Sequence, residues 1–151
     1  MSVNWLKKSA FYLISRIGLK LYSCFPLFGR LQGSFAVIRR DSLILLIERN
    51  DGRGLSFPGG IQTPWEEETT ALKREVLEET GLKVTWHQSL LLYEENTEIP
   101  VRLAVYNVQT EGQVRGSWEG TPCWLEPRNA QPRVLRSQRR IIDVILGEDK
   151  A

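Results

Sequence analysis

The chain has 151 residues, of which 42% are apolar and 25% are charged, and its net charge at neutral pH is +2. This length and balance are ordinary for a single globular domain. Two cysteines, Cys24 and Cys123, are too few for a disulfide framework and are not spaced as metal ligands. Their number suits a reducing compartment, and we expect a cytoplasmic protein.

Basic residues are concentrated at one end of the chain. Residues 1–40 hold seven lysines and arginines and no acid, which leaves thirteen basic against eighteen acidic residues in the remainder. The basic end could meet anionic lipid, a phosphate-rich substrate or the acidic rest of the fold. The basic residues do not cover a groove-sized face, so we expect no nucleic-acid polymer as partner. We predict two parts, an extension over residues 1–30 and a domain over residues 31–151.

The extension is predicted to contain an amphipathic helix over residues 3–24. Arg16 and Lys20 interrupt it too often for a membrane span, which needs about 20 nearly uncharged residues. It lacks the cleavage site of a signal peptide. Two interpretations stay open: the helix packs on its own domain or on a second subunit of a homodimer, or it makes peripheral membrane contact through a basic face. Its apolar stripe is Leu6, Ala10, Leu13, Ile14, Ile17 and Leu21.

Strands and helices alternate along the rest of the chain. Apolar runs predict strands over residues 35–40, 43–48, 55–57, 84–94, 101–109 and 123–125. Helices are predicted over residues 64–80 and from Ser137, as N-cap, to about Leu146. We expect loops over residues 57–60 and 113–122 and irregular backbone over 127–132. This order predicts an α/β or α+β domain.

The helix over residues 64–80 carries its own start and stop signals. Thr63 is placed as an N-cap, Pro64 as the first helical residue and Glu66 as a capping-box glutamate. Gly81 suits the C-terminal end. Upstream, the glycines of Phe57-Pro58-Gly59-Gly60 would let backbone carbonyls approach a metal closely.

Three glutamates of this helix are spaced to share one face. Glu75, Glu78 and Glu79 stand at positions i, i+3 and i+4. Carboxylates so placed repel one another, and a bound divalent cation removes this unfavourable electrostatic energy. Arg74 can pair with a neighbouring carboxylate and fix its rotamer. The alternative for a glutamate-rich helix is a solvated, salt-bridged surface.

The run from Gly60 to Leu82 resembles a complete Nudix box. It consists of glycine, five residues, Glu66, seven residues and then Arg-Glu-Val-Leu-Glu-Glu-Thr-Gly-Leu. The resemblance implies an α-β-α sandwich around a mixed β-sheet, here with an extra N-terminal helix. It also implies a Mg²⁺- or Mn²⁺-dependent hydrolase that cleaves a phosphoanhydride in a nucleoside diphosphate linked to a group X.

The resemblance also assigns roles to box residues. Glu75, Glu78 and Glu79 would be metal ligands, joined by the carbonyl of Gly59. Glu75 is the first candidate for the general base, and Arg74 would orient it.

A further glutamate lies outside the box, in the loop before the last strand. In nucleoside-triphosphate-cleaving Nudix proteins, a glutamate here often reaches the metal a few residues before a tryptophan-bearing strand. Glu119, before Trp124, resembles it and would be a ligand and the second candidate for the base. A solvated loop acid is the alternative, and Glu111 is a less well placed competitor.

Residues that bind the substrate are not assigned by the sequence. Trp86, Trp118 and Trp124 could stack on a base or pack within the fold. The segment over residues 137–140 could contact a base or a phosphate, or only cap its helix.

The signatures of three Nudix subgroups are missing. Pro100 comes later than the proline typical of ADP-sugar hydrolases, no tyrosine occupies the usual place of the dinucleoside-polyphosphate group, and residues 46–49 lack the coenzyme A motif. MutT-like cleavage of a nucleoside triphosphate, including an oxidised one, to the monophosphate and pyrophosphate is preferred by elimination. ADP-sugar or other nucleotide-derivative hydrolysis is an alternative. A non-catalytic binding module is another, although its usual mark, loss of box carboxylates, is missing.

Overall fold

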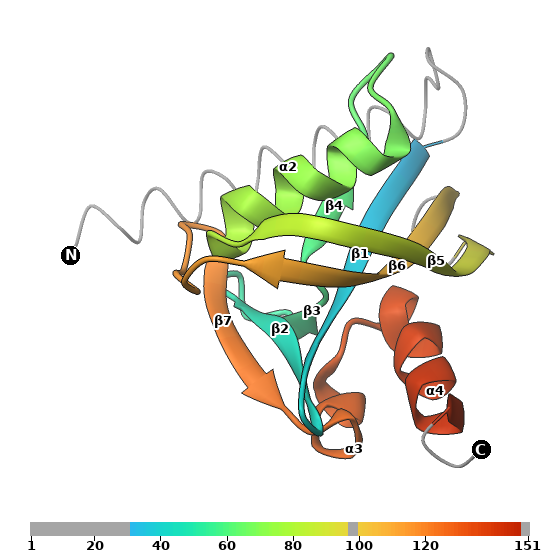
Figure 1. Cartoon of the computed structure of the whole chain (residues 1–151). Helices are drawn as coiled ribbons and strands as arrows, with labels where there is room; N and C mark the ends of the chain where they lie inside the picture. Colours follow the sequence, from blue (N-terminus) through green and yellow to red (C-terminus); the bar gives the residue numbers. More distant parts are fainter. Residues whose placement is uncertain (1–30, 97–99, 149–151) are drawn as a thin grey trace, which may run out of the picture.

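A computed structural model describes residues 31–96 and 100–148, and Figure 1 shows the chain. The predicted helix over residues 3–24, and with it the expected subunit or membrane contact, lies outside the described residues. No helix in the described ranges is long and apolar enough to cross a membrane. In chain order the elements are β1 (Leu31–Arg40), β2 (Leu43–Arg49), β3 (Leu55–Ser56), β4 (Gly59–Ile61), α2 (Glu68–Thr80), β5 (Lys83–Glu95), β6 (Val101–Glu111), β7 (Gly120–Leu125), α3 (Pro127–Ala130), the 3₁₀ turns η1 (Gln131–Arg133) and η2 (Arg136–Gln138), and α4 (Arg139–Glu148).

The central strand of the sheet is β1. It pairs antiparallel with β2 and β4 and parallel with β6, which in turn pairs antiparallel with β5. β2 continues the sheet to β3 and β7, so that the described residues form a seven-stranded mixed sheet. β1 and β2 contain the strands predicted over residues 35–40 and 43–48 and form a hairpin, in which Asp41 takes the left-handed backbone conformation, with φ 54°, that a short polar residue tolerates.

Two apolar layers cover the two faces of this sheet, because side chains alternate along β1. Phe35 and Val37 join the isoleucines of α4 in one buried cluster. Ala36 and Ile38 join apolar side chains of α2 in the other. Figure 1 shows α2 and α4 apart on the two sides of the sheet. The predicted α-β-α sandwich around a mixed sheet is therefore confirmed.

The start of α2 differs from the prediction. The helix begins at Glu68, and its N-cap residue, Glu67, makes no side-chain cap bond. Thr63 to Glu66 instead form a turn, in which the Glu66 N–H donates to the Thr63 carbonyl at 3.1 Å. Trp65 has φ 64°, so the turn has a proline at its second position and positive φ at its third, the pattern of a type II turn. The predicted end at Gly81 is confirmed by its φ of 72° and its N–H bond to the Leu77 carbonyl.

Three further local predictions are wrong. Residues 59–61 form a strand, β4, because Gly59 and Ile61 pair with β1, and part of the predicted irregular stretch forms α3. Ser137 does not cap α4; it lies in η2. Contacts distant in sequence fix that turn, since the Gln138 side chain accepts the Phe57 N–H at 2.8 Å and the Ser137 carbonyl accepts the Tyr93 hydroxyl at 2.7 Å.

Candidate active site

The three box glutamates lie on one side of α2 but differ in burial. Glu79 is 6% exposed, the side chain of Glu75 is 15% exposed and that of Glu78 is 60% exposed. Ala71, Leu72, Val76 and Thr80 are buried. The carboxylate face therefore runs from the buried side of the helix out to solvent.

Glu79 contacts the backbone of β4, the short strand that lies before the helix in the chain. Its Oε2 accepts the Gly59 N–H at 2.8 Å. Burial raises the pKa of Glu79 to about 8, and the charges of Glu119 and Glu75 add to the rise, although the Gly59 bond and Arg49 oppose it. Gly59 has φ 142°, and a Cβ there would lie 2.1 Å from the Ser34 carbonyl oxygen, so this position requires glycine.

Glu75 lies against Gly60, the next residue of β4. A Cβ on Gly60 would meet the Glu75 carboxylate carbon at 2.6 Å. Arg74 Nη1 donates to Glu75 Oε1 at 2.8 Å. Burial raises the pKa of Glu75 and the charges of Glu78 and Glu119 add to it, while Arg74 opposes the rise. The absence of a side chain at Gly60 thus makes room for a partly buried carboxylate.

Arg74 makes its two-pronged contact with Glu66 rather than with a box glutamate on its own helix. Its Nε and Nη2 donate to the two carboxylate oxygens of Glu66 at 2.8 and 3.0 Å. These bonds lower the pKa of Glu66 to about 2, with help from the Thr63 N–H. The sequence interpretation of Glu66 as a capping residue missed this clamp. The available signal was its fixed place eight residues before Arg74 in the box.

Glu119 is brought to the box by the pairing of β2 with β7. Arg49 is in register with Gly120, and the Asn50 N–H donates to the Glu119 carbonyl at 2.9 Å. The Glu119 charge acts on Glu75 and Glu79, as their raised pKa values show. Its competitor Glu111 lies at the end of β6, where it pairs with Lys83 at 3.3 Å.

Arg49 is a site residue that the sequence interpretation missed. It lies at the end of β2, and its guanidinium pairs with Asp51, Nη2 to Oδ2, at 2.5 Å. Burial alone would lower the pKa of Arg49. The bonds to Asp51 and the charges of Glu79 and Glu119 outweigh this effect, so the pKa of Arg49 is raised. A positive charge therefore stands among the carboxylates. The sequence signal that could have identified Arg49 was its place after the apolar strand 43–48 and before the glycines at 59 and 60.

The donor set suits hard divalent cations. The candidates are the side chains of Glu75, Glu78, Glu79 and Glu119 and the carbonyl of Gly59, all of them oxygens. Within residues 31–96 and 100–148, no three acidic, histidine or cysteine side chains are grouped so that they could hold a metal ion by themselves. Mg²⁺ usually takes one or two protein carboxylates together with waters and substrate phosphates, so these mutually repelling carboxylates fit such an ion.

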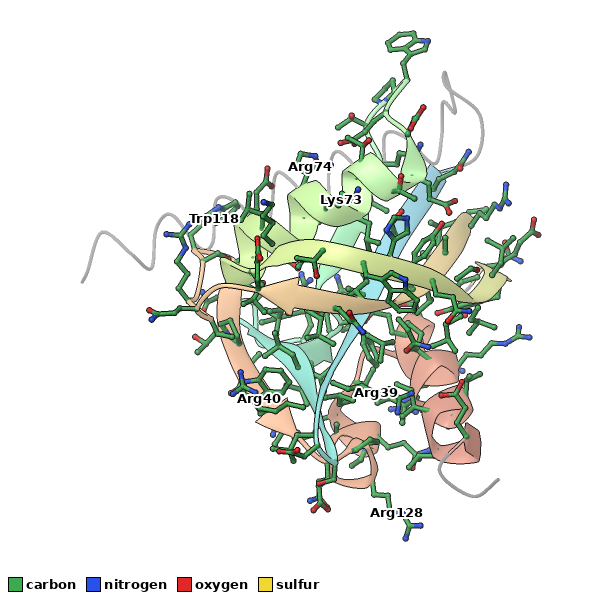
Figure 2. All side chains as sticks on the ribbon, in the orientation of Figure 1. Arg39, Arg40, Lys73, Arg74, Trp118 and Arg128 are labelled. Carbon is green, nitrogen blue, oxygen red and sulfur yellow. The ribbon has the colours of Figure 1, made fainter. Side chains whose placement is uncertain are left out.

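The three tryptophans that could stack on a base lie on separate elements. Trp86 is on β5 and is 45% exposed. Trp118, which Figure 2 labels, precedes β7 and is 62% exposed. Trp124 lies within β7, with the Arg40 guanidinium 4.3 Å from its ring centroid. In the segment over residues 137–140, Arg140 lies over the Tyr93 ring at 5.4 Å. These positions do not identify a base-binding residue.

Comparison with known proteins identifies the family of this chain. The NUDIX domain family matches residues 30–143. A MutT-like protein of Streptomyces ambofaciens is 32% identical over 113 residues, which are 74% of this chain and 73% of that protein.

Solved structures show the same fold. The MutT NUDIX hydrolase of Burkholderia pseudomallei is 25% identical, with a TM-score of 0.64 over 74% of this chain and 93% of that one. The E. coli ORF135 protein has a TM-score of 0.70 at 23% identity, over 82% and 93% of the two chains. The chain belongs to the Nudix family and is a Nudix hydrolase.

Proposed function

We propose that this Nudix hydrolase is a metal-dependent pyrophosphohydrolase that converts a nucleoside triphosphate into its monophosphate and pyrophosphate, with oxidised nucleotides among its substrates. The observation that carries the proposal is the convergence of Glu75, Glu79 and Glu119 beside β4, where the charge of Glu119 raises the pKa values of both Glu75 and Glu79. A partly buried group of repelling carboxylates stabilises no fold by itself, and its natural complement is a cation that also binds phosphate. The MutT-like relative supports the substrate class.

Glu75, Glu78, Glu79 and Glu119, with the Gly59 carbonyl, would hold Mg²⁺ or Mn²⁺. When bound, such ions neutralise phosphate charge and lower the pKa of a coordinated water. The Gly59 N–H already fixes one oxygen of Glu79, at 2.8 Å, which leaves the other oxygen for a ligand. Burial of Glu79 keeps this part of the site away from competing water.

Glu75 is proposed as the general base that takes the proton of the attacking water. Its raised pKa brings it closer to neutral pH, where a general base is most effective. Arg74 holds its Oε1 at 2.8 Å, and Glu66 holds Arg74 in turn, so the carboxylate has one preferred orientation. Glu119 is the second candidate, since its charge acts on Glu75 and Glu79 from the loop before β7.

The test is pyrophosphate and phosphate release from a panel of nucleotides with Mg²⁺, with Mn²⁺ and with EDTA. The panel contains the dNTPs, oxidised dGTP, ADP-ribose, dinucleoside polyphosphates and coenzyme A. Metal-dependent release from triphosphates, lost in Glu78→Gln and kept in the control Glu111→Gln, is the expected result. Turnover of ADP-ribose alone would move the chain to the ADP-sugar class. No turnover of any compound with either metal would contradict the proposal and favour a binding module.

A further inference from the structure

A cavity of about 280 Å³ opens at the C-terminal ends of β1 and β6, beside β7. Its size is near the lower end of the range for small-molecule pockets, about 300–1,000 Å³. Six side chains carry the argument that follows: Ile38, Arg40, Leu82, Val108, Thr110 and Trp124.

Strand alternation decides which side chains face this cavity. Ile38 and Val108 belong to the buried cluster on the α2 side of the sheet. Together with Leu82 they form the floor of the cavity. Arg40 and Thr110 stand two residues further along the same strands, so they point to the same side. Arg39 points to the opposite side, where its Nη2 lies 2.7 Å from Glu148 Oε2. Figure 2 shows Arg40 beside β7 and Arg39 towards α4.

Arg40 is held in place by Trp124. Its guanidinium carbon lies 4.3 Å from the indole ring centroid, a cation–π contact that fixes the plane of the guanidinium and leaves its edge for hydrogen bonds. Arg40 is the arginine whose side chain faces the cavity, and none of the residues that line it is acidic. A pre-organised guanidinium fork over an apolar floor suits a planar or tetrahedral oxyanion that carries a small apolar body.

The cavity is separate from the box carboxylates. Along β7, Trp124 lies four residues beyond Gly120, which is roughly 13 Å at the rise of an extended strand. The cavity touches the Nudix box at Leu82, two residues after the end of α2. A ligand here would therefore not compete directly for the site around Glu75 and Glu79.

We propose that this cavity is a second binding site, for a small organic anion whose phosphate or carboxylate group is held by Arg40 and Thr110. The apolar part of the ligand packs on Ile38, Leu82 and Val108, beside the Trp124 ring. The charge-assisted bond to Arg40 supplies the selectivity for an anion, and the apolar floor supplies the selectivity against a bare inorganic ion.

Calorimetric titration of the full chain in EDTA tests this site. The probes are phenyl phosphate, benzoate, inorganic phosphate and the neutral benzyl alcohol. We expect saturable binding of one or both aromatic anions, weaker binding of inorganic phosphate, and none of benzyl alcohol. Whichever of phenyl phosphate and benzoate binds with the higher affinity identifies the head group, phosphate or carboxylate. Absence of saturable binding for both anions, or equal binding of benzyl alcohol, would overturn the proposal.

Variants locate the site. Arg40→Gln should weaken binding of the preferred anion by about tenfold or more, as expected for loss of a charge-assisted bond. Thr110→Val should weaken it less. The matched control is Arg102→Gln, which removes an exposed arginine at the other end of β6, and Glu79→Gln checks the Nudix site. Both should bind as the natural chain does; equal weakening by Arg102→Gln, or loss in Glu79→Gln alone, would overturn the assignment.

A spectroscopic measurement does not depend on the fold of the Arg40 variant. The indole N–H resonance of Trp124 can be identified by its loss in Trp124→Phe. It should shift progressively during titration with the preferred anion, and with the same dissociation constant as the calorimetry. If this resonance stays still while another tryptophan signal shifts, the anion binds elsewhere and the proposal fails.

Discussion

The buried carboxylate of Glu79 accepts a hydrogen bond from the Gly59 N–H, 2.8 Å away. This bond joins the second half of α2 to the strand β4. The bond favours the charged carboxylate, but burial together with the charges of Glu119 and Glu75 outweighs it. Without a bound cation the folded protein therefore keeps a proton on Glu79 at neutral pH. A metal ion bound by Glu79, as proposed above, would have to displace that proton, and metal binding would then depend on pH.

Stability without metal should fall as the pH rises through the titration of Glu79. The folded-state pKa is about 8, against an ordinary value of 4.5. Between these values the folded protein binds a proton that the unfolded chain has lost, so the free energy of unfolding decreases with rising pH. Thermal unfolding in EDTA at pH 5, 7 and 9 measures this decrease.

Glu79→Gln isolates the contribution, because the neutral amide oxygen can still accept the Gly59 N–H. The variant should be more stable than the natural chain at pH 9, with the difference largely gone near pH 5. Added Mg²⁺ should stabilise only the natural chain at high pH. Parallel pH profiles for the two proteins in EDTA would contradict this account.

Gly60→Ala should reduce catalysis far more than it reduces stability. The new Cβ would lie 2.6–2.8 Å from three atoms of the Glu75 carboxyl group, which is the movable end of a side chain. The carboxylate must therefore shift, and a displacement of about 1 Å can cost on the order of 100-fold in rate. We expect kcat to fall by about that factor and the melting temperature to change little.

The matched control is Gly147→Ala. Gly147 lies in α4, and a Cβ there meets nothing within 4 Å. That change should leave kcat unaltered and raise stability by about 0.5–1 kcal/mol, the usual helix gain of alanine over glycine. Equal kcat values for Gly60→Ala and the natural chain would show that the position of Glu75 is not critical.

The clamp between Glu66 and Arg74 should stabilise the fold at neutral pH and lose its effect in acid. The folded-state pKa of Glu66, about 2, lies below its ordinary 4.5, so its contribution is present above about pH 4.5 and disappears as the pH falls towards 2. Because Arg74 is partly exposed, we expect Glu66→Gln to cost about 1 kcal/mol at pH 7.

Chemical unfolding at pH 7 and pH 2.5 measures this difference. The neighbouring Glu67→Gln serves as the control, since Glu67 makes no side-chain cap bond. Arg74→Lys keeps the positive charge but removes the two-pronged contact, and it should lower kcat by disordering Glu75. A Glu66→Gln cost that persists unchanged at pH 2.5 would mean that the loss is not electrostatic.

Periodic patterns predicted most of this fold, because they depend on residues close in sequence. The strands from Phe35 to Arg40 and from Leu43 to Glu48, and the helix end at Gly81, follow from local apolar runs and a left-handed glycine. β4 was missed because Gly59 and Gly60 carry no strand signal, and their pairing with β1 exists only in the assembled sheet.

In the site, too, the features that depend on residues close in sequence could be predicted, and those that depend on the assembled fold could not. The shared face of Glu75, Glu78 and Glu79 follows from helix geometry alone. The contact of Arg74 with Glu66 could not be derived in this way, because Trp65 takes positive φ and turns Glu66 back towards the helix. Arg49 was missed for a related reason: its place beside Glu79 depends on how β2 packs in the fold.

The role of the β7 loop can be tested by comparing two glutamates that were both candidates from the sequence. Glu119 lies where its charge raises the pKa of both Glu75 and Glu79, whereas Glu111 is at the end of β6 beside Lys83. Glu119→Gln should lower kcat with Mg²⁺ by about 100-fold, as for loss of a general base or a metal ligand. Glu111→Gln should not change it.

The pH dependence of Glu119→Gln shows whether Glu119 is a metal ligand or acts on Glu79 only through its charge. Removal of the Glu119 charge relieves repulsion at Glu79, so the pKa of Glu79 should fall in Glu119→Gln and stay unchanged in Glu111→Gln. A carboxyl carbon resonance of Glu79, assigned with Glu79→Gln and titrated by NMR in EDTA, measures this shift. A lowered pKa with normal kcat would mean that Glu119 tunes the site without holding the metal or moving the proton.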